Sequence, residues 1–437
     1  MNATTEELPV EVVPPPRPDG ARLAKLGLLA AMVSRLVGRL VGIVLVIVLA
    51  READSQTVAV YGYLLGTATL VTILTDLGVA SVAGREVAAG RMPADGALHA
   101  ALLPQLCSVL AAGAVTVLLA EFAGPQAAPP MAVALTVGFV LVGGMNNLWA
   151  DVLRGTGRVV LEGALQLGSA VALVAAGSLV IEFGGNATDL LIVVVLKEVA
   201  VLLIAAAVLR PRRRPEVRSR TLLGQGMWVA VAGTAIVLLW RQGTLVIGGA
   251  GSIGALATYV VATRFFDAGV TVAHTAGFGL RPGMAALAAD PAAFRHAARR
   301  YLGLVTLLGV VVAGVGVLVA GPITTIPFGE RWASAVPAVR MVAVSGLPIL
   351  LTYVSLALLS ARRQMRWLCL SSVAGAVVGV AVTVLLTLAR PDAFSAVVGT
   401  TVGATVMALA LLAGLRDLVL PARGPVPAEA VCGGGGF

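Results

Sequence analysis

The stretch TDLLIVVVLKEVAVLLIAAAVLRPRRRPEVRSR, residues 188–220, shows how the chain is built. Its first part, 188–209, is almost wholly apolar and is long enough for a helix to cross a hydrocarbon core of about 30 Å. Its second part, 210–220, carries a dense cluster of arginines: Arg210, Arg212, Arg213, Arg214, Arg218 and Arg220. The stretch therefore predicts a membrane-spanning helix followed by a basic linker.

The rest of the chain repeats the apolar part of this pattern. Of its 437 residues, 58% are apolar and only 12% are charged, with a mean hydropathy of +0.96. Soluble domains contain roughly a quarter charged residues, so a soluble protein is excluded and a polytopic membrane protein is predicted. Continuous apolar runs of this length favour helices over the alternating strands of a barrel. We predict twelve spans: 26–50, 57–80, 97–120, 131–152, 159–182, 188–209, 221–248, 254–278, 302–321, 336–360, 367–389 and 394–416.

The basic linker 210–220 separates two sets of six spans. Because six is even, both sets enter the membrane in the same direction, which predicts a parallel repeat. The expected fold is an all-α polytopic membrane protein with about 12 transmembrane helices, in two six-helix lobes related by a pseudo-two-fold axis around a central cavity. We expect the lobes at 26–209 and 221–416, a disordered cytoplasmic tail at 1–25, and a second cytoplasmic tail at 417–437.

The distribution of basic residues sets the orientation. With the chain starting inside, twenty-two of the 31 basic residues fall in cytoplasmic segments, whereas the outside loops hold three, Arg51, Arg331 and Arg390. This asymmetry follows the positive-inside rule and predicts that both termini are cytoplasmic. The formal net charge of +9 thus reflects membrane topology rather than nucleic-acid binding. We expect a multi-pass protein of a bacterial inner membrane that contacts membrane lipids.

Two arginines in the first span lie where charge is expensive. Only eleven residues separate Arg39 from Arg51, a helical rise of about 16 Å, so the guanidinium of Arg39 must lie within the membrane. Arg35 precedes Arg39 by four residues and shares its helix face. Each such charge costs about 2.5–3.5 kcal/mol on insertion scales, so a polar cavity is expected to face this pair.

Other spans carry similar polar groups. In the eighth span, Arg264, Asp267 and His274 follow helical spacing with Thr271, and Arg264 is expected to pair with Asp267. Arg241 of the seventh span lies about where the repeat would place a counterpart of Arg39, and Asp76 lies on one face of the second span with Thr69 and Thr72. Lys197 and Glu198 of the sixth span are adjacent, so their side chains should diverge by about 100° and not pair, leaving one to reach the cavity. Asp151 and Glu162 flank the loop at Arg154, where we expect water to solvate them.

A cavity with excess arginine suits a large hydrophilic anion such as a pyrophosphate, because guanidinium groups bind phosphate oxygens in pairs. We therefore assign Arg35, Arg39, Arg241 and Arg264 to an anionic head group. Asp76, Asp267, His274, Lys197 and Glu198 are candidates for cavity polar groups or for coupling to ions or protons. No phosphate cradle for ATP, large outside loop or metal-like cysteine spacing is found, so we expect no catalysis, cofactor, metal or nucleic-acid partner.

Short motifs in both halves resemble a known family. They are Arg51, Tyr61-Gly62-Tyr63, Asp76-Leu77-Gly78 and Arg85-Glu86 in the first half, then Tyr259 to Arg264, Pro282, Arg299-Arg300-Tyr301, Phe328-Gly329-Glu330-Arg331-Trp332, Ala335 and Arg362-Arg363-Gln364. The chain resembles the polysaccharide-biosynthesis membrane proteins, which are lipid-linked oligosaccharide flippases of the multidrug/oligosaccharidyl-lipid/polysaccharide exporter superfamily.

The resemblance implies two lobes that open alternately to the two sides of the membrane, with a polyprenyl-pyrophosphate-linked oligosaccharide as cargo. It also implies that Arg35 and Arg39 meet the anionic cargo and that a glycan polymerase and chain-length proteins are partners. The acidic interior of cation-coupled drug exporters and two extra terminal helices of the peptidoglycan-precursor branch are not evident. A drug or small-metabolite antiporter, a membrane glycosyltransferase, polymerase or ligase, and a scaffold or channel are the alternative functions.

Overall fold

The computed structural model describes residues 33–34, 37–38, 41–75, 78–125, 128–209, 220–250, 252–287, 290–362 and 364–416. Within these ranges the chain is helical and forms no strand. Residues 41–52 are helical and lead into α2 (Ser55–Leu74). The first half continues with α3 (Val79–Ala88), α4 (Ala94–Ala123), α5 (Pro130–Gly155), α6 (Val159–Glu182) and α7 (Ala187–Leu209). The second half contains α8 (Arg220–Gly249), α9 (Ile253–Leu287), α10 (Pro291–Phe328), the short 3-10 helix η1 (Glu330–Ala335), α11 (Val336–Ala361), α12 (Met365–Ala389) and α13 (Ala393–Ala413).

Ten helices of the described part are long and apolar enough to cross a membrane. They correspond to the third through twelfth predicted spans and confirm a polytopic all-α protein. The first predicted span is described only in part. The second was placed at 57–80, but α2 ends at Leu74 and a separate short helix, α3, begins at Val79. The break follows from Gly78, whose φ of 73° is left-handed and cannot continue a right-handed helix.

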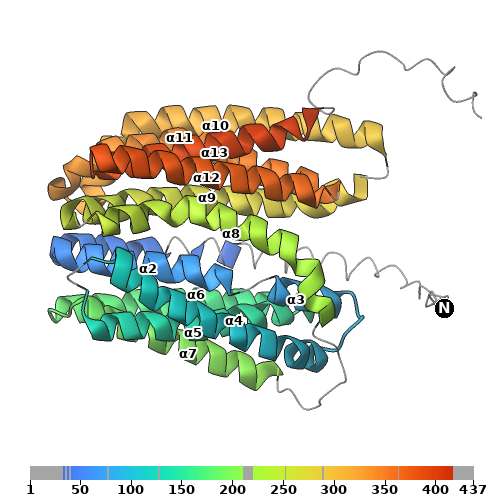
Figure 1. Cartoon of the computed structure of the whole chain (residues 1–437), viewed down its shortest axis with the longest axis horizontal. Coiled ribbons are helices and arrows are strands. Elements are labelled where there is room, and N and C mark those ends of the chain that lie inside the picture. Colours follow the sequence, from blue (N-terminus) through green and yellow to red (C-terminus); the bar gives the residue numbers. More distant parts are fainter. Residues whose placement is uncertain are drawn as a thin grey trace, which may run out of the picture.

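The helices form two lobes. Figure 1 shows the first half of the chain, blue to green, on one side and the second half, yellow-green to red, on the other. Contacts between α4, α5 and α7 build the first lobe, and contacts between α8, α9, α11, α12 and α13 build the second. Helix α2 lies at the boundary, where it packs against α8 and α9. The predicted domain bounds, 26–209 and 221–416, stay a prediction.

The lobes differ in how far their helices are buried. In the most apolar 18-residue stretch of α6 only 11% of the residues are buried inside the protein, and in that of α7 only 17%. The corresponding share is 61% for the helical segment that includes α11. Large apolar side chains such as Leu196 and Leu203 therefore point outward from α7. A surface of this kind faces lipid, since lipid tails are as apolar as leucine. Consequently α6 and α7 present one face to lipid and the other to the lobe interior.

Helix α10 is longer than its predicted span, which was 302–321. The structure extends it to Pro291 at the start and Phe328 at the end. Asp290 caps its first turn, because its carboxylate accepts hydrogen bonds from the main-chain N–H groups of Ala292 and Ala293 at 2.9 and 3.0 Å. Pro291 at the first helical position suits this start. Charged residues on the first turns, including Arg295, Arg299 and Arg300, were expected in a loop but lie on this helix.

Candidate functional site

Three neighbouring compartments between the helices share some of their lining residues. The central compartment, about 580 Å³, is lined by both lobes, including Arg154, Lys197, Arg241, Asp267 and His274. A second space of about 190 Å³ shares Arg241 and Asp267 with the central one and adds Arg264; we call it the arginine compartment. A third, of about 210 Å³, lies between α5, α6 and α7. We call it the amide compartment because it is lined by Asn146, Asn147 and Gln166, and it shares Gln166 and Lys197 with the central one.

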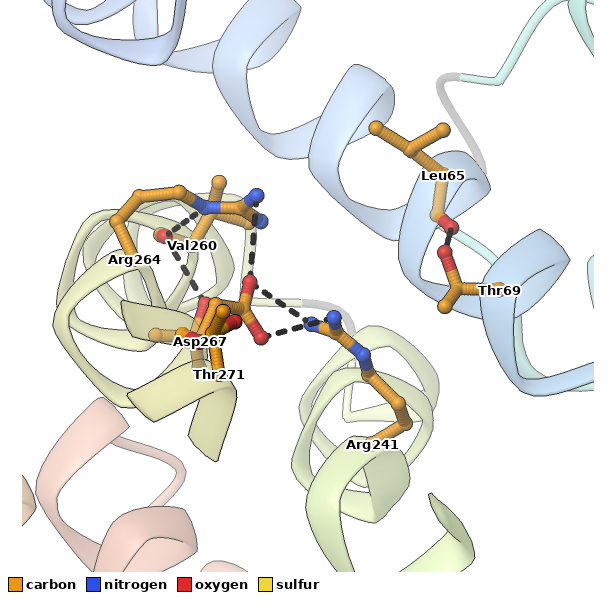
Figure 2. Close-up of polar contacts among 8 residues, drawn as sticks. Leu65, Thr69, Arg241, Val260, Arg264, Asp267 and Thr271 are labelled. Carbon is orange, nitrogen blue, oxygen red and sulfur yellow. Dashed lines mark hydrogen bonds and ion pairs between the residues drawn. The ribbon is translucent and has the colours of Figure 1, made fainter. Parts of the chain in front are cut away.

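The arginine compartment is organised around one carboxylate. Asp267 of α9 lies 2.8 Å from Nη2 of Arg241 on α8, and Nη1 of the same guanidinium donates to the other carboxylate oxygen at 3.3 Å. Arg264, one helical turn before Asp267, places Nη1 3.5 Å from Oδ2. Figure 2 shows both guanidinium groups directed at Asp267 from two helices. The predicted pairing of Arg264 with Asp267 is confirmed, and Arg241 joins it from a position 26 residues earlier.

Further hydrogen bonds fix these groups. Nε of Arg264 donates to the main-chain oxygen of Val260 at 3.2 Å, and the hydroxyl of Thr271 donates to the main-chain oxygen of Asp267 at 2.7 Å. On α2, drawn beside these helices in Figure 2, Thr69 donates to the main-chain oxygen of Leu65 at 2.7 Å. Thr69 lines the central compartment, and Leu65 lines the arginine compartment together with the charged cluster. The arginine cluster therefore shares this compartment with α2.

The cluster carries more positive than negative charge. The side chains of Arg241, Asp267 and Arg264 are only 16%, 23% and 15% exposed, so water screens them weakly. Two guanidinium groups share a single carboxylate, which leaves one positive charge in excess. Both arginines line the arginine compartment, a partly desolvated space where charge-assisted hydrogen bonds to an anion are strong. The arrangement can bind a phosphate-like group.

The amide compartment contradicts one prediction. Lys197 and Glu198 of α7 were expected not to pair, but Nζ of Lys197 lies 2.5 Å from Oε1 of Glu198. Asn146 of α5 completes the group, since its Nδ2 donates to Oε2 of Glu198 at 2.6 Å and to the main-chain oxygen of Glu198 at 3.0 Å. The amide holds the carboxylate back toward its own helix, so the flexible lysine can reach it despite the divergence of adjacent Cβ atoms. Both predicted residues do line the cavity.

A second carboxylate was misjudged. Glu162 of α6 was expected to be solvated at the loop, but it is buried, with 3% of its surface exposed, and it lines both the central and amide compartments. Nε of Arg154 lies 3.9 Å from Glu162, and Nη2 of the same arginine lies 2.5 Å from Asp151. Arg154 thus lies against Glu162 at the end of the cavity that is nearest the α5–α6 loop.

The other predicted residues divide into two groups. His274 lies on the wall of the central compartment, with its ring 5.4 Å from that of Tyr353 in an edge-on contact. Arg35, Arg39 and Asp76 lie outside the described residues. Gly38 and Gly42, close to Arg39 in sequence, line the central compartment. Head-group binding by the four arginines stays a prediction, as does a coupling role for Asp76, Asp267, His274, Lys197 and Glu198.

Sequence reasoning missed the uncharged part of the cavity. Asn146, Asn147, Gln166 and Ser169 line the amide compartment, yet none was proposed as a site residue. The available signal was their position inside apolar spans, where polar side chains are costly unless they face a partner or a cavity. Among the described side chains, no three His, Cys, Asp or Glu residues gather as metal ligands would.

One end of the lobe interface is closed by two arginines. Arg51, before α2, donates through Nε and Nη2 to the main-chain oxygens of Pro327 and Ile326 at the end of α10, both at 2.5 Å. Arg331 of η1 donates in return to the main-chain oxygens of Ala50 and Ala53. We call this reciprocal contact the arginine clamp. The clamp lies at one end of the molecule. Arg154 and the polar lining of the cavity lie at the opposite end.

Trp332 supports the clamp from the second lobe. Its indole N–H donates to the main-chain oxygen of Ala50 at 2.9 Å, and the guanidinium of Arg331 lies 5.3 Å from its ring centre. Only 3% of Trp332 is exposed. The carbonyls involved belong to the last turns of helices, which lack partners within the helix and carry the negative end of its dipole. Positive donors are therefore well placed there.

Comparisons with known proteins agree on a membrane transporter fold. A family model described as "Polysaccharide biosynthesis protein" matches residues 25–282. No curated protein matches the chain.

Solved structures match over nearly the whole chain. An inward-facing multidrug resistance MATE family transporter of the MOP superfamily has a TM-score of 0.68 at 14% identity, covering 89% of this chain and 98% of that one. The lipid II flippase MurJ in an inward closed conformation has a TM-score of 0.67 at 11% identity, covering 90% and 89%. An outward-facing MATE transporter has a TM-score of 0.63 at 15% identity, covering 91% and 96%. At these identities the likeness establishes the two-lobe fold.

Proposed function

Because the chain belongs to the polysaccharide biosynthesis protein family, we propose that it is a flippase for a polyprenyl-pyrophosphate-linked oligosaccharide. It carries this lipid from the cytoplasmic to the outer leaflet of a bacterial inner membrane by alternating access. On the outer side a glycan polymerase and chain-length proteins would receive the cargo. The MurJ likeness supports the proposal at the level of fold, since that protein is named as a lipid II flippase.

The observation that carries the proposal is the arrangement of two guanidinium groups around one carboxylate. Arg241 and Arg264 share Asp267 in a partly desolvated compartment of about 190 Å³. A pyrophosphate offers several oxygens that can take up the donors which Asp267 leaves unused. Each charge-assisted hydrogen bond formed there contributes about 1.5–3 kcal/mol. The site thus supplies an anchor for the charged part of the cargo.

The closed and open ends of the cavity support alternating access. With cytoplasmic termini, as the charge distribution predicts, the arginine clamp of Arg51 and Arg331 lies on the outer side. The central compartment then extends toward the cytoplasm at Arg154. This state would admit cargo from the cytoplasmic leaflet. Opening the clamp while the opposite end closes would present the same arginines to the outer leaflet.

A reconstitution experiment tests the proposal. The purified protein is placed in liposomes with a fluorescent polyprenyl-pyrophosphate oligosaccharide, and transfer between leaflets is followed by a quencher that cannot cross the membrane. We expect the wild type to move the lipid. Arg241→Gln and Arg264→Gln should each slow transfer about tenfold or more, because each removes a donor of the anion site. Arg300→Gln, an exposed arginine of α10 outside the cavity, is the matched control and should transfer at the wild-type rate.

The alternatives give different results in the same preparation. An antiporter would exchange small cations or drugs and leave the glycolipid in its original leaflet. A glycosyltransferase, polymerase or ligase would form new glycosidic bonds, which mass spectrometry of the recovered lipid would detect. Equal transfer by wild type and both arginine variants would remove the anion site from the mechanism.

A further inference from the structure

The two ends of the cavity differ in charge and in chemistry. The arginine compartment places two guanidinium groups around one carboxylate. In the amide compartment each of the two carboxylates has a cationic partner, Glu198 with Lys197 and Glu162 with Arg154, and the rest of the polar lining is neutral. The excess positive charge that attracts an anion thus lies in the first compartment and not among the described residues of the second. The amide compartment suits a ligand that is polar and uncharged.

Asn146 lines this space, and the orientation of its side-chain amide is fixed. Its amide nitrogen donates to two oxygens of Glu198, at 2.6 and 3.0 Å. Because both of these oxygens are acceptors, the nitrogen must face Glu198, and the orientation of the amide is settled. Its Oδ1 is then buried with no hydrogen-bond partner among the described residues. A buried acceptor without a partner is unfavourable, so a hydroxyl or N–H donor from a ligand would be held well at this point.

Two further amides are available nearby. The side chains of Asn147 on α5 and Gln166 on α6 line the amide compartment, and neither makes a hydrogen bond to another part of the chain that the structure describes. Each offers two N–H donors and a carbonyl acceptor in one plane. Neighbouring hydroxyls or an acetamido group on a sugar ring present complementary donors and acceptors. A lipid tail could not use these groups and would leave them desolvated.

One ligand can reach both ends at the same time. The central compartment shares Arg241 and Asp267 with the arginine compartment, and Gln166 and Lys197 with the amide compartment. Its volume of about 580 Å³ lies within the range of roughly 300–1,000 Å³ found for ligand sites. A molecule with an anionic group at one end and hydroxyl-rich rings at the other matches the two lobes.

We propose that the amide compartment is the glycan subsite, and this inference rests on the proposed flippase function. It takes one or more uncharged, hydroxyl- and amide-bearing sugar rings of the cargo while the pyrophosphate lies at Arg241 and Arg264. Oδ1 of Asn146 accepts a hydrogen bond from a sugar hydroxyl or acetamido N–H. Asn147 and Gln166 bind neighbouring groups, and the pair formed by Lys197 and Glu198 keeps Asn146 in place. These residues determine which glycans are accepted.

Binding to two lipids separates this subsite from the anion site. The full chain in nanodiscs is titrated with a polyprenyl pyrophosphate carrying an oligosaccharide and with undecaprenyl pyrophosphate without sugar. We expect the wild type to bind the glycan-bearing lipid more tightly. Asn147→Ala and Gln166→Ala should each lower the affinity for the glycan-bearing lipid about three- to tenfold, because each loses one or two hydrogen bonds. Their affinity for the sugar-free lipid should stay unchanged. Arg241→Gln should lower the affinity for both lipids.

Two controls keep the result interpretable. Gln56→Ala removes an exposed amide outside the cavity and should bind both lipids as the wild type does. Asn146→Ala also releases Glu198, so its thermal midpoint is compared with that of Asn147→Ala, which leaves the ion pair of Lys197 and Glu198 intact. Loss of glycan-dependent affinity in the stable Asn147→Ala and Gln166→Ala variants supports the subsite without reliance on Asn146.

The failure of the subsite is distinguishable from the failure of the function. Equal affinity of the wild type for both lipids, or variants that weaken both lipids alike, would overturn the subsite while leaving the flippase proposal in place. If the wild type bound neither lipid, the proposed function and the subsite would both be wrong.

Discussion

Gly62 of α2 and Val260 of α9 are in direct contact across the lobe interface. A Cβ atom built on Gly62 would lie 2.6 Å from Cγ1 and 2.9 Å from Cβ of Val260, closer than packed carbon atoms can be. Both helices are at the boundary between lobes. Glycine at this position is therefore required for the lobes to close here.

We expect Gly62→Ala to separate the lobes near this contact. An added methyl group in a packed interface costs about 1–3 kcal/mol. Val260→Gly in the same chain removes both Cγ methyl groups and the Cβ atom, and should restore the closed state. Spin labels on cysteines at Glu52 and Ser334, which are exposed on opposite lobes, measure the separation in a background without native cysteines. An unchanged distance distribution in Gly62→Ala would show that the interface accommodates the methyl group.

The arginine clamp should control the same end. Arg331→Gln removes the guanidinium that reaches Ala50 and Ala53, and Arg51→Gln removes the one that reaches Ile326 and Pro327. We expect each to destabilise the closed state by about 1–3 kcal/mol, with the larger effect for Arg331, whose contact to Ala50 is less exposed to solvent. The same label pair reports the shift, and Arg390→Gln serves as an arginine control outside the clamp. A clamp variant that stayed as closed as the control would disprove this role.

Neutralising Asp267 should strengthen anion binding. Asp267→Asn removes the carboxylate that both Arg241 and Arg264 contact, so more guanidinium donors become available to a pyrophosphate. We expect affinity for undecaprenyl pyrophosphate to rise about tenfold, equivalent to about 1.4 kcal/mol, and turnover to fall because release becomes slower. Calorimetric titration and the leaflet-transfer assay measure the two effects. Glu121→Gln, an exposed carboxylate, is the control. Weaker binding by Asp267→Asn would mean that Asp267 holds the arginines in a binding geometry rather than competing for them.

The membrane orientation is open to a direct test. The charge distribution places Glu52 outside and Thr156 inside. In cells lacking native cysteines in this protein, a membrane-impermeant maleimide should label Glu52→Cys in intact spheroplasts. Thr156→Cys should react only after permeabilisation. The reverse pattern would place the arginine clamp on the cytoplasmic side and change the present state from inward-facing to outward-facing.

Sequence patterns were sufficient where the physical cause is local. Apolar runs longer than the hydrocarbon core predicted ten spans that the described chain forms. The spacing of Arg264 and Asp267 predicted their contact, since residues three apart share a helix face. Arg241 was assigned to the cavity, but its direct contact with Asp267 depends on how α8 and α9 pack, which no local pattern encodes.

Predictions from local sequence failed where a contact with a residue far away in the sequence decides the position of a side chain. The adjacent pair of Lys197 and Glu198 was expected to diverge, but Asn146, 52 residues before Glu198, binds that carboxylate and makes the pairing possible. Glu162 was expected to be solvated beside the loop at Arg154, and only the placement of α5 beside α6 and α7 shows that it is buried. The clamp could not be predicted from residue types because the arginines bind carbonyl oxygens, which every residue carries.

Main-chain oxygens as acceptors affect how the arginine clamp responds to pH and to mutation. A carbonyl oxygen at the end of a helix neither titrates nor disappears when Ala50, Ala53, Ile326 or Pro327 is exchanged for another residue. Changes in pH and substitutions at these four positions therefore leave the hydrogen-bond acceptors of the arginine clamp intact. Selection can adjust the strength of this closure through the donor side chains, Arg51, Arg331 and Trp332.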